Sequence, residues 1–436
     1  MTDKRQLALD IVRTLRAAGH TALFAGGCVR DMLRAVPPHD YDVVTSARPE
    51  QVRALFRKTF EVGAQFGVVL VVLEGVSFEV ATFRSDDAYE DGRRPVSVTF
   101  STPEADAQRR DFTMNGLFYD PVEERVLDYV SGRADIERRV VRCIGDATAR
   151  FTEDKLRMLR AVRFASNLGY DIEPETFRAI QQMAPQVAVV SAERIRDELI
   201  KIFARPNAGR GLRLLDNSGL LGVVLPEVAA MKGCEQPPQF HPEGDVFIHT
   251  CLMMDGLREA SLTLAFATLL HDVGKPPTFQ RAPDRIRFNE HDAIGGRMTE
   301  TILRRLRFPN EQIDQIVACV ENHMVFRNAP EMRKAKLKRL LARPTFAEEL
   351  ELHRLDCLAS HADLTNYDFL KNVVLEIPPQ VAAPPPLITG DDLLAMGMKP
   401  GPEMGALLRE ARELQLEEKL HTPDEALAWA RQRLAH

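Results

Sequence analysis

Segments with the pattern of β-strands are confined to the first third of this 436-residue chain. Apolar runs with the sequences TALFAGG, DYDVVT, FGVVLVVLEG and VSFEVATF alternate there with helical patterns, which predicts a compact α/β head. From about residue 136 the strand patterns stop and amphipathic helical segments take over. These helices are expected at 153–168, 174–183, 191–204, 207–218, 249–270, 290–306, 310–322, 332–343 and 347–372. The order predicts an α+β protein whose N-terminal head, with a small mixed sheet, is followed by all-helical parts.

Chain length and proline-rich breaks divide the helical part further. A chain of 436 residues is too long for one hydrophobic core, so several domains are expected. Proline-rich stretches at 232–245 and 377–390 are typical of loops or linkers. We therefore expect four parts, which are a head over 1–135, a helical neck over 136–230, a helical body over 231–375 and a helical tail over 376–436.

Composition excludes several classes of protein. The net charge is −6, so any contact with nucleic acid must use a local basic patch, and residues 150–213 carry a local excess of basic side chains. The six cysteines are scattered without a CxxC pair, which argues against a disulfide framework or zinc knuckle and favours a reducing compartment. No membrane span or secretion signal is expected, so the prediction is a cytoplasmic protein without a membrane partner.

A glycine turn followed by two carboxylates is the first candidate for a functional site. Gly26 and Gly27 precede a predicted helix, where backbone N–H groups can bind phosphate, and Arg30 adds positive charge. Asp40 and Asp42 are two residues apart on a predicted strand, so their side chains are expected on one face. Such a pair suits Mg²⁺ held together with substrate phosphates. A bare DxD is otherwise a polar strand end, and the glycine turn upstream favours the metal-binding interpretation.

Glu79, on a later predicted strand, is a candidate for the third carboxylate, with an outward charge on an edge strand as the alternative. Three such groups would support two-metal phosphoryl transfer, in which one ion activates a hydroxyl and the other stabilises the triphosphate and the departing pyrophosphate.

Arg109, Arg110 and Asp111 form another candidate, because adjacent arginines beside a carboxylate can hold phosphate and hydroxyl groups. The alternative there is a surface cluster of ion pairs.

The segment TEDKLRMLRAVRF, residues 152–164, combines helical spacing with charge. Thr152 is expected to cap a helix with Glu153 and Asp154 in its first turn, and Arg157 can pair with either acid. A capped helix with ion pairs accounts for these residues. A carboxylate beside a guanidinium, here Asp154 with Arg157, would also complement the Watson–Crick edges of cytosine and adenine and mispair with guanine and uracil.

The successive motifs of the first half of the chain resemble those of class II tRNA nucleotidyltransferases, a family that includes the bacterial poly(A) polymerases. The motifs, in family order, are GGCVRDMLR with HDYDVVTSA, FEVATFRSD, RRDFTMNGLFYD, GRADIERRVVRCIGDATARFTEDKLRMLRAVRFA and SAERIRDELIKIF. Two departures stand out. Gly116 replaces an alanine and is expected to loosen a helix there, and Lys155 stands where proline is common.

The resemblance implies a role for each of these elements. Asp40 and Asp42 would bind the catalytic Mg²⁺ ions, and the segment with Asp154 and Arg157 would be an amino-acid template for CTP and ATP. Arg160 and Arg163 would then face nucleotide phosphate or base, or orient Asp154. The other implied nucleotide contacts are Gly27 and Arg30 to the triphosphate and Arg109, Arg110 and Asp111 to ribose and triphosphate.

Four activities share such a head: CCA addition, CC-only addition, A-only addition and poly(A) synthesis. The segment VGAQFGVVLVV resembles tRNA-specific members, and the polar loop RSDDAYEDGRRPVSVTF argues against CC-only enzymes, which typically lack such a loop. A-only addition is harder to exclude. We predict addition of C, C and A to the tRNA 3′ end from CTP and ATP, with release of pyrophosphate. The oligomeric state, monomer or homodimer, is left open.

A second set of residues in the C-terminal half resembles the HD phosphohydrolase superfamily. Its candidate metal ligands are His249, the adjacent His271 and Asp272 within LLHDVGKP, and the distal Asp356, while Lys275 is a candidate phosphate contact. Imidazole with carboxylate suits Ni²⁺, Mn²⁺ or another transition-metal ion better than Mg²⁺. The implied activities are 2′,3′-cyclic phosphodiesterase and phosphatase, and the alternative is a retained fold without activity.

Two rival functions apply to the whole chain. One is an HD phosphohydrolase whose head only binds nucleotide or RNA, and the other is a tRNA-binding chaperone without catalysis. Loss of incorporation after replacement of both Asp40 and Asp42 would separate the first rival from a nucleotidyltransferase.

Overall fold

The computed structural model describes residues 3–61, 67–86, 98–239, 241–377, 382 and 384–434. The chain divides into two compact units, Met1–Ala229 and Ala230–His436, which are described separately below. The boundary between the units falls where the neck was expected to end, and the finer division into four parts stays a prediction. Among the described helices, none has both the length and the apolarity needed to cross a membrane.

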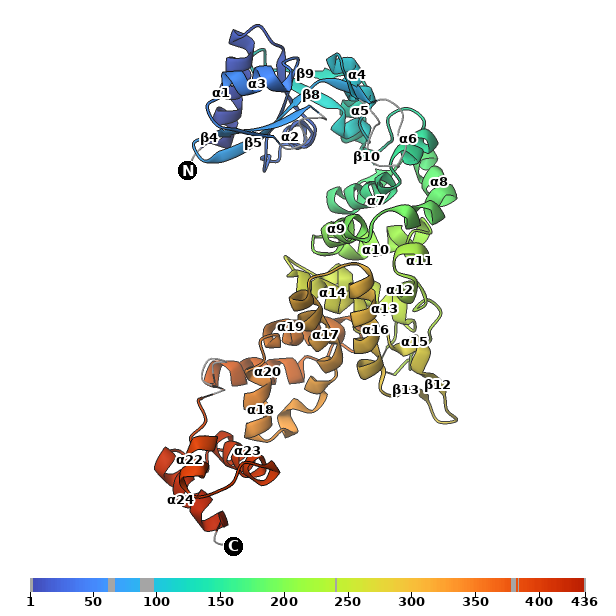
Figure 1. The fold of residues 1–436 in the computed structure, drawn as a ribbon. Coiled ribbons are helices and arrows are strands. Elements are labelled where there is room, and N and C mark those ends of the chain that lie inside the picture. Colours follow the sequence, from blue (N-terminus) through green and yellow to red (C-terminus); the bar gives the residue numbers. More distant parts are fainter. Residues whose placement is uncertain are drawn as a thin grey trace. The chain divides into compact units, whose positions relative to one another are not determined.

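A mixed sheet forms the core of the head, as predicted (Figure 1). Only β2 and β5 run parallel, and the other neighbouring strands of the sheet are antiparallel. The buried run of β1 ends at Gly26, whose φ of 69° turns the chain into the next helix. In sheet order, the described strands are β3 (Thr59–Glu61), β4 (Val68–Leu73), β5 (Val76–Thr82), β2 (Asp42–Thr45), β1 (Ala22–Ala25), β8 (Leu117–Asp120) and β9 (Arg125–Asp128).

Helices and a small two-stranded ladder complete the head. Helix α1 begins after Asp3, whose carboxylate accepts from two backbone N–H groups of the first turn, and it buries an apolar face. The remaining elements of the head are α2 (Gly27–Leu33), α3 (Pro49–Leu55), β6 (Arg84–Asp86), β7 (Val98–Phe100), α4 (Pro103–Gln108), the 3₁₀ turn η2 (Thr113–Asn115) and α5 (Gly132–Arg138), with α1 spanning Lys4–Ala17.

Gly116 does not loosen a helix, contrary to expectation. It follows the 3₁₀ turn η2, and a Cβ atom at this position would lie 2.8 Å from Val130 Cγ2 and 3.0 Å from Ile144 Cδ1. The close packing of this turn against its neighbours therefore explains a residue without a side chain.

The neck is helical except for one short parallel ladder, β10 (Val140–Val141) with β11 (Asp171–Ile172), so the expectation of an entirely helical neck was wrong in this detail. Strands of two residues are too short to show an alternating pattern in sequence. The helical elements are α6 (Ala147–Glu153), α7 (Leu156–Leu168), α8 (Pro174–Met183), η3 (Ala184–Val189), α9 (Ala192–Phe203), α10 (Ala208–Asn217), α11 (Leu221–Val224) and α12 (Pro226–Ala229).

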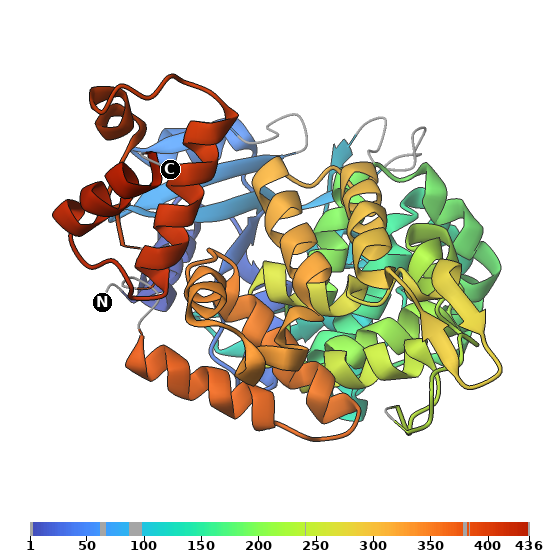
Figure 2. The same ribbon diagram turned by 90° about the horizontal axis from the view of Figure 1, so that it is seen from below.

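The second unit is built from helices around the buried α14 (Leu262–Leu270), in which every residue after the first is buried. A hairpin, β12 (Phe279–Arg281) with β13 (Ile286–Phe288), lies at the edge of this unit in both views (Figure 1, Figure 2), so the expectation of an entirely helical body over 231–375 was wrong in this detail. The other described elements are α13 (Val246–Gly256), α15 (Lys275–Thr278), α16 (His291–Arg305), α17 (Asn310–Asn322), η4 (Val325–Glu331), α18 (Lys334–Leu341), α19 (Phe346–Ala359), α20 (Thr365–Glu376), α22 (Gly390–Ala395), α23 (Pro402–Leu416) and α24 (Pro423–Leu434).

Candidate active sites

The glycine turn brings a carboxylate and an arginine close to the backbone. Gly26 has a positive φ, and a Cβ atom there would lie 3.2 Å from Arg110 Nη1 and 4.0 Å from Asp42 Oδ2. A side chain at this position would therefore be strained and would crowd both groups. The turn leaves open space beside them in which a phosphate could approach the backbone.

Two of the three predicted carboxylates lie on neighbouring parallel strands. Val43 of β2 is opposite Val80 of β5, so Asp42 and Glu79 project together on the face opposite those buried valines. Burial among the walls of the site, and then the negative charges of Glu79 and Asp40, raise the pKa of Asp42 to about 6.

Asp40 lies two residues before the start of β2, so it does not share a strand face with Asp42 as expected. Lys4 Nζ donates to Asp40 Oδ1 over 3.0 Å, and His39 Nδ1 lies 2.7 Å from Asp40 Oδ2. The hydrogen bonds from His39 and Lys4 lower the pKa of this exposed carboxyl. Asp40 is thus ionised and paired at the rim of the site.

These carboxylates fit a divalent cation. The negative charges of Glu79 and Asp40 raise the pKa of Asp42, a cation would offset that repulsion, and oxygen donors are the ligands of hard ions. Asp40, Asp42 and Glu79 would hold such an ion.

A cavity of about 570 Å³ joins the head to the neck within the first unit. Most of the predicted nucleotide-binding residues line it, whereas Asp40, Glu79, Glu153 and Arg163 are outside its described lining. The lining residues are Gly26, Gly27, Arg30, Asp42, Arg109, Arg110, Asp111, Asn115, Asp154, Leu156, Arg157, Arg160, Phe164 and Arg194. One side of the cavity is therefore suited to phosphates, and the other presents the predicted base-reading residues.

Asp106, which the sequence interpretation missed, orients the two neighbouring arginines of the RRD element. It is fully buried in α4, and Arg109 donates to its Oδ1 over 2.7 and 2.9 Å while Arg110 donates to its Oδ2 over 2.9 and 3.1 Å. The spacing of three and four residues along a helix was the signal in the sequence. This shared carboxylate fixes both guanidinium groups at the cavity wall.

Asp111 connects the head to helix α7 of the neck. Arg160 donates two hydrogen bonds to Asp111 Oδ2, and Asn115 Nδ2 donates to its Oδ1 over 3.1 Å. Burial alone would raise the pKa of Asp111, but the charge and hydrogen bonds of Arg160 outweigh it and lower the pKa to about 2. Asp111 is therefore a permanent anion that holds Arg160 in the wall.

The predicted continuous helix over 153–168 is interrupted, so the assignment of Thr152 as its N-cap was wrong. Helix α6 ends at Glu153, Asp154 has extended backbone angles of φ −147° and ψ 105°, and α7 begins at Leu156. Thr152 lies within α6 and donates to the Thr148 carbonyl. The interruption places Asp154 at the junction of two helices, where it lines the cavity.

Asp154 and Arg157 both line the cavity, and each is held by another charged side chain. Arg194 of α9 donates to Asp154 Oδ2 over 2.7 Å, and Arg157 Nη1 donates to Glu153 Oε2. Arg157 also donates to the carbonyl of Arg109 over 3.3 Å, and its side chain is almost entirely buried. Arg194 was missed, although it lies in the quoted motif SAERIRDELIKIF.

Arg163 does not line the cavity in which it was expected to face the nucleotide. Its Nε donates to the buried carboxylate of Glu198, and its guanidinium lies 4.0 Å from the centre of the Phe164 ring. Phe164, another missed residue, lines the cavity itself. Arg163 therefore supports Phe164 from behind.

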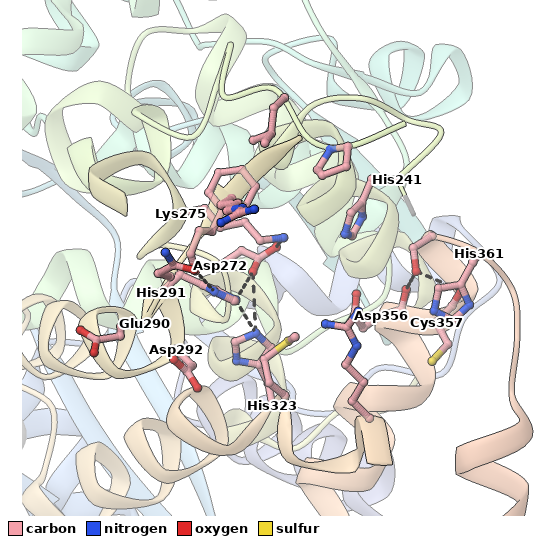
Figure 3. Close-up of a pocket in the computed structure, with 18 of the residues that line it drawn as sticks. His241, Asp272, Lys275, Glu290, His291, Asp292, His323, Asp356, Cys357 and His361 are labelled. Atoms are coloured by element: carbon pink, nitrogen blue, oxygen red, sulfur yellow. Dashed lines mark hydrogen bonds and ion pairs between the residues drawn. The ribbon is translucent and has the colours of Figure 1, made fainter. Parts of the chain in front are cut away.

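The second unit brings together all four candidate ligands of the HD-like motif, of which Figure 3 labels Asp272 and Asp356. His249 Nε2 lies 3.0 Å from Asp356 Oδ1, and His271 Nε2 lies 3.1 Å from Asp272 Oδ2. Nε2 of His249 and His271 and Oδ2 of Asp272 are buried, and each lies within 3.1 Å of another ionisable group of the cluster. Imidazole nitrogens and carboxylate oxygens gathered in this way fit a metal ion, and His249, His271 and Asp272 form a group with metal-binding spacing.

The charged groups of this cluster shift one another's pKa values. Despite burial, the imidazole charges lower the pKa of Asp356 and of Asp272, and Lys275 also contributes at Asp272. Burial lowers the pKa of His323 to about 4, whereas Asp356 and Glu243 overcome burial and raise that of His249 to about 9. Lys275 Nζ lies 2.7 Å from Asp272 Oδ2, at the edge of a cavity of about 510 Å³.

The polar loop that argued against CC-only addition extends over residues 84–100, and its central part, 87–97, lies outside the described residues. Part of the segment VGAQFGVVLVV, residues 62–66, lies outside them as well. The expectations that rest on these two segments stay predictions.

Three family models match the chain. They are the poly(A) polymerase head domain over residues 22–142, the "Probable RNA and SrmB-binding site of polymerase A" over 169–232, and tRNA nucleotidyltransferase domain 2 over 293–430. The HD-like pair at 271 and 272 lies outside these three segments.

The chain is also similar to named proteins and to a solved structure. It is 48% identical over 216 residues to the CCA-adding enzyme of Geobacillus stearothermophilus, covering 49% of this chain and 53% of that protein. It is 34% identical to the A-adding tRNA nucleotidyltransferase of Deinococcus radiodurans over 94% of each chain. The crystal structure of the Bacillus stearothermophilus CCA-adding enzyme with CTP superposes with a TM-score of 0.77 at 30% identity, over 100% of this chain and 98% of that one.

The match spans about half the length of the first curated relatives and nearly the whole length of the Deinococcus protein. Together with the order of the family models and the mixed sheet of the head, this similarity identifies the family. The chain belongs to the class II tRNA nucleotidyltransferase and poly(A) polymerase family, whose members generally use a divalent metal ion.

Proposed function

We propose that this protein adds C, C and A to the 3′ end of tRNA, using CTP and ATP and releasing pyrophosphate. The observation that carries the proposal is the single cavity in which Asp42, the glycine turn and the RRD arginines face the junction at Asp154. Phosphoryl transfer and base selection need these two groups of residues within the length of one nucleotide. The relatives named CCA-adding enzymes and the solved complex with CTP support it.

In this proposal the 3′ hydroxyl oxygen of tRNA attacks the α-phosphorus, and the bond to the β-phosphate breaks. Mg²⁺ bound at Asp40, Asp42 and Glu79 would increase the acidity of the hydroxyl and neutralise charge on the triphosphate. Arg109 and Arg110, held in place by Asp106, bind the phosphates of the incoming nucleotide.

In this proposal the base is selected by two hydrogen bonds, one accepted by Asp154 and one donated by Arg157. Asp154 keeps lone pairs for the exocyclic amino group of cytosine or adenine while it accepts from Arg194. Arg157 offers donors to the ring nitrogen beside that amino group. Guanine and uracil would instead place a carbonyl oxygen against the carboxylate, and such a mismatch costs about 1–3 kcal/mol for each group.

The nearly full-length similarity to an A-adding enzyme makes A-only addition the alternative. The deciding assay uses tRNA ending before CCA, with CTP alone, ATP alone or both, and sizes the products on a gel. We expect two nucleotides with CTP and three with both. An A-adding enzyme would leave this tRNA unextended and add one nucleotide only to tRNA already ending in CC.

A double variant, Asp40→Ala with Asp42→Ala, tests whether the head is the catalyst. We expect incorporation to fall to background while tRNA binding persists. Incorporation that survives this change would reject the proposal, and an inactive wild-type chain that still binds tRNA would favour a binding protein instead.

The buried histidine and aspartate cluster supports a second function, hydrolysis of a phosphate ester such as a 2′,3′-cyclic phosphate, with Ni²⁺ or Mn²⁺ held by His249, His271, Asp272 and Asp356. Basic side chains that would attract phosphate line the same cavity, namely Lys275, Arg285, Arg287 and Arg327. The test uses an RNA oligonucleotide with a 2′,3′-cyclic phosphate end and added Ni²⁺ or Mn²⁺. Ring opening by wild type but not by Asp272→Ala is expected, and equal rates would reject it.

We also propose a cytoplasmic location. All six cysteines are buried and none forms a disulfide in the described part of the chain, which agrees with a reducing compartment.

A further inference from the structure

The last three helices of the second unit share an apolar core. Figure 1 shows α22, α23 and α24 grouped near the C-terminus, and their buried side chains include Leu393, Met404 and Ala426. Helix α18 belongs to a different core, in which Leu337 packs with Phe326. Among the described residues these two clusters have no member in common. The contact between α18 and α23 therefore joins two separate cores.

Ion pairs link α18 to the C-terminal end of α23. The carboxylate of Glu418 bridges two lysines, because its Oε2 accepts from Lys334 Nζ and its Oε1 accepts from Lys338 Nζ, each over 2.9 Å. Glu413 Oε2 accepts from Arg339 Nη1 over 2.6 Å. The hydrogen bonds from the two lysines lower the pKa of Glu418 to about 2. Glu418 is thus an anion at neutral pH, shared between two cations.

Each of the two helix ends carries charge of the sign that its own dipole disfavours. Arg333 and Lys334 stand at the start of α18, and no described side chain of its first turn caps it. The last four residues of α23 are ELQL, and two more glutamates, Glu417 and Glu418, follow. Glu417 Oε1 accepts from the backbone N–H of Ala335 over 3.2 Å, so α23 supplies a cap for α18. Contact between the two ends therefore offsets an unfavourable charge on each.

The backbone of Glu418 has a conformation that usually belongs to glycine. Its φ of 59° lies in the left-handed region, directly after the C-cap of α23. Glycine at this position would relieve the strain. The glutamate that stands there instead has its carboxylate on Lys334 and Lys338, and this contact accounts for a charged residue at a strained position.

We propose that Glu413, Glu417 and Glu418 form an ionic latch that holds α22–α24 against α18, and that the phosphates of an RNA backbone open it by competing for the same basic groups. A phosphate diester offers a negative charge and acceptor oxygens, as a carboxylate does. The exposed Arg333 and Lys336 extend the basic side of α18 beyond the latch. This inference rests on the proposed function, because tRNA supplies the RNA. The protein's own carboxylates would then shield the basic groups of α18 until RNA displaces them.

The distance between two spin labels tests the latch directly. The labels are attached through Asn372→Cys on α20, which shares the core of α18, and Gln432→Cys on α24. Both positions are exposed and lie outside the latch, and the six native cysteines are buried. Double electron–electron resonance is expected to give one narrow distribution of distances at low salt. Saturating tRNA that ends before CCA, or about 1 M NaCl, in which the screening length is about 3 Å, is expected to add a longer and broader one.

Charge reversal separates the latch from other effects of RNA. Lys334→Glu with Lys338→Glu is expected to raise the open population at low salt, without RNA, by roughly tenfold or more, because surface ion pairs contribute about 1.5- to 5-fold each and like charges then face each other. Adding Glu418→Lys rebuilds the bridge with opposite charges and is expected to restore the closed distribution. Lys336→Glu is the matched control, since it makes the same change of charge at an exposed position of the same helix, and it is expected to stay closed. Circular dichroism checks that each variant is folded.

Labels that keep one distribution in saturating tRNA, or in the folded variant with both lysines reversed, overturn the proposal. Failure of the proposed function gives a different result. Incorporation of CTP and ATP with an unopened latch rejects the latch alone, whereas a latch that opens on tRNA without incorporation supports the latch and rejects nucleotide addition.

Discussion

At the scale of single residues, the carboxylate of Asp42 in the proposed active site lowers the stability of the folded head. Its pKa of about 6 lies above the ordinary value because burial and like charges disfavour the carboxylate. In the absence of metal, the ionised side chain therefore destabilises the folded head at every pH above its folded pKa. This cost falls as the pH drops through 6 and is lost below 4, where the group becomes protonated in both states.

Replacement of Asp42 by asparagine is accordingly expected to abolish nucleotide incorporation and to stabilise the metal-free protein at neutral pH. Asp42 borders an open cavity, so solvent screening limits the gain to about 1 kcal/mol or less. Thermal unfolding at pH 8 and pH 4 measures it, and the gain should be present only at pH 8. A variant less stable than wild type at pH 8 would contradict the assignment of the raised pKa.

We treat Arg194 as a positioning residue, because its guanidinium donates to Asp154, the proposed base-reading carboxylate. We expect Arg194→Ala to let the carboxylate move and to reduce discrimination against GTP and UTP by roughly tenfold, with partial rescue by Arg194→Lys. The measurement compares kcat/KM for CTP with that for UTP. Arg196→Ala, on the same helix with Asp197 as its neighbour, is the matched control. An equal loss for both nucleotides would indicate a purely structural role.

Residues that line the cavity were predictable where a motif carries them, as for Gly26, Asp42 and Arg110. They were not predictable where the partner comes from a distant segment. Asp106 leaves a signal only in its helical spacing to Arg109 and Arg110, and Arg194 is 40 residues from Asp154. Tertiary packing, which periodicity does not report, decides such pairs.

At the scale of elements, regular helices were predicted well and irregular backbone was not. The expected helix at 310–322 matches α17. The expected helix at 153–168 is interrupted at Asp154, although its sequence has helical spacing throughout. Periodicity reports which faces are buried, and two consecutive helices that share a buried side produce nearly the same pattern as one.

The break between α6 and α7 makes Lys155 a position at which a substitution could stabilise the folded protein. Its φ of −60° is the value that a proline ring imposes, and Asp154 before it already has the extended backbone that proline requires of its neighbour. We expect Lys155→Pro to increase the free energy of unfolding by about 0.4–1 kcal/mol, by restricting the unfolded chain. Chemical denaturation measures the change. Lys155→Ala controls for loss of the bond from Lys155 Nζ to the Thr152 carbonyl, and a proline variant less stable than this control would refute the argument.

At the scale of the whole molecule, two compact units carry two different kinds of candidate metal ligands. Carboxylates gather in the first unit, and imidazoles with carboxylates gather in the second. The α+β order was predictable from the motifs and helical patterns of the sequence. His291 and His323 are also visible in the sequence, but only the helix packing shows that they converge on Asp272.

Metal binding should therefore stabilise the units separately. At a Ni²⁺ concentration of 100 times the dissociation constant, the second unit gains about 2.7 kcal/mol, or roughly 5–10 °C in its melting temperature. Differential scanning calorimetry of the full chain, with and without Ni²⁺, measures this shift. Asp272→Ala should remove the shift and Asp42→Ala should leave it in place, so a shift that Asp42→Ala abolishes would place the tight site in the head.

The junction between α6 and α7 has an evolutionary consequence. In the proposed site, the groups that would handle phosphate belong to the head sheet and its turns, whereas the side chain that would face the base belongs to a break between two neck helices. Mutations at the break would then alter which bases are accepted without disturbing the phosphate-binding groups. Under the proposed function, a lineage could move between adding C, adding A and adding both by small changes at the junction of α6 and α7.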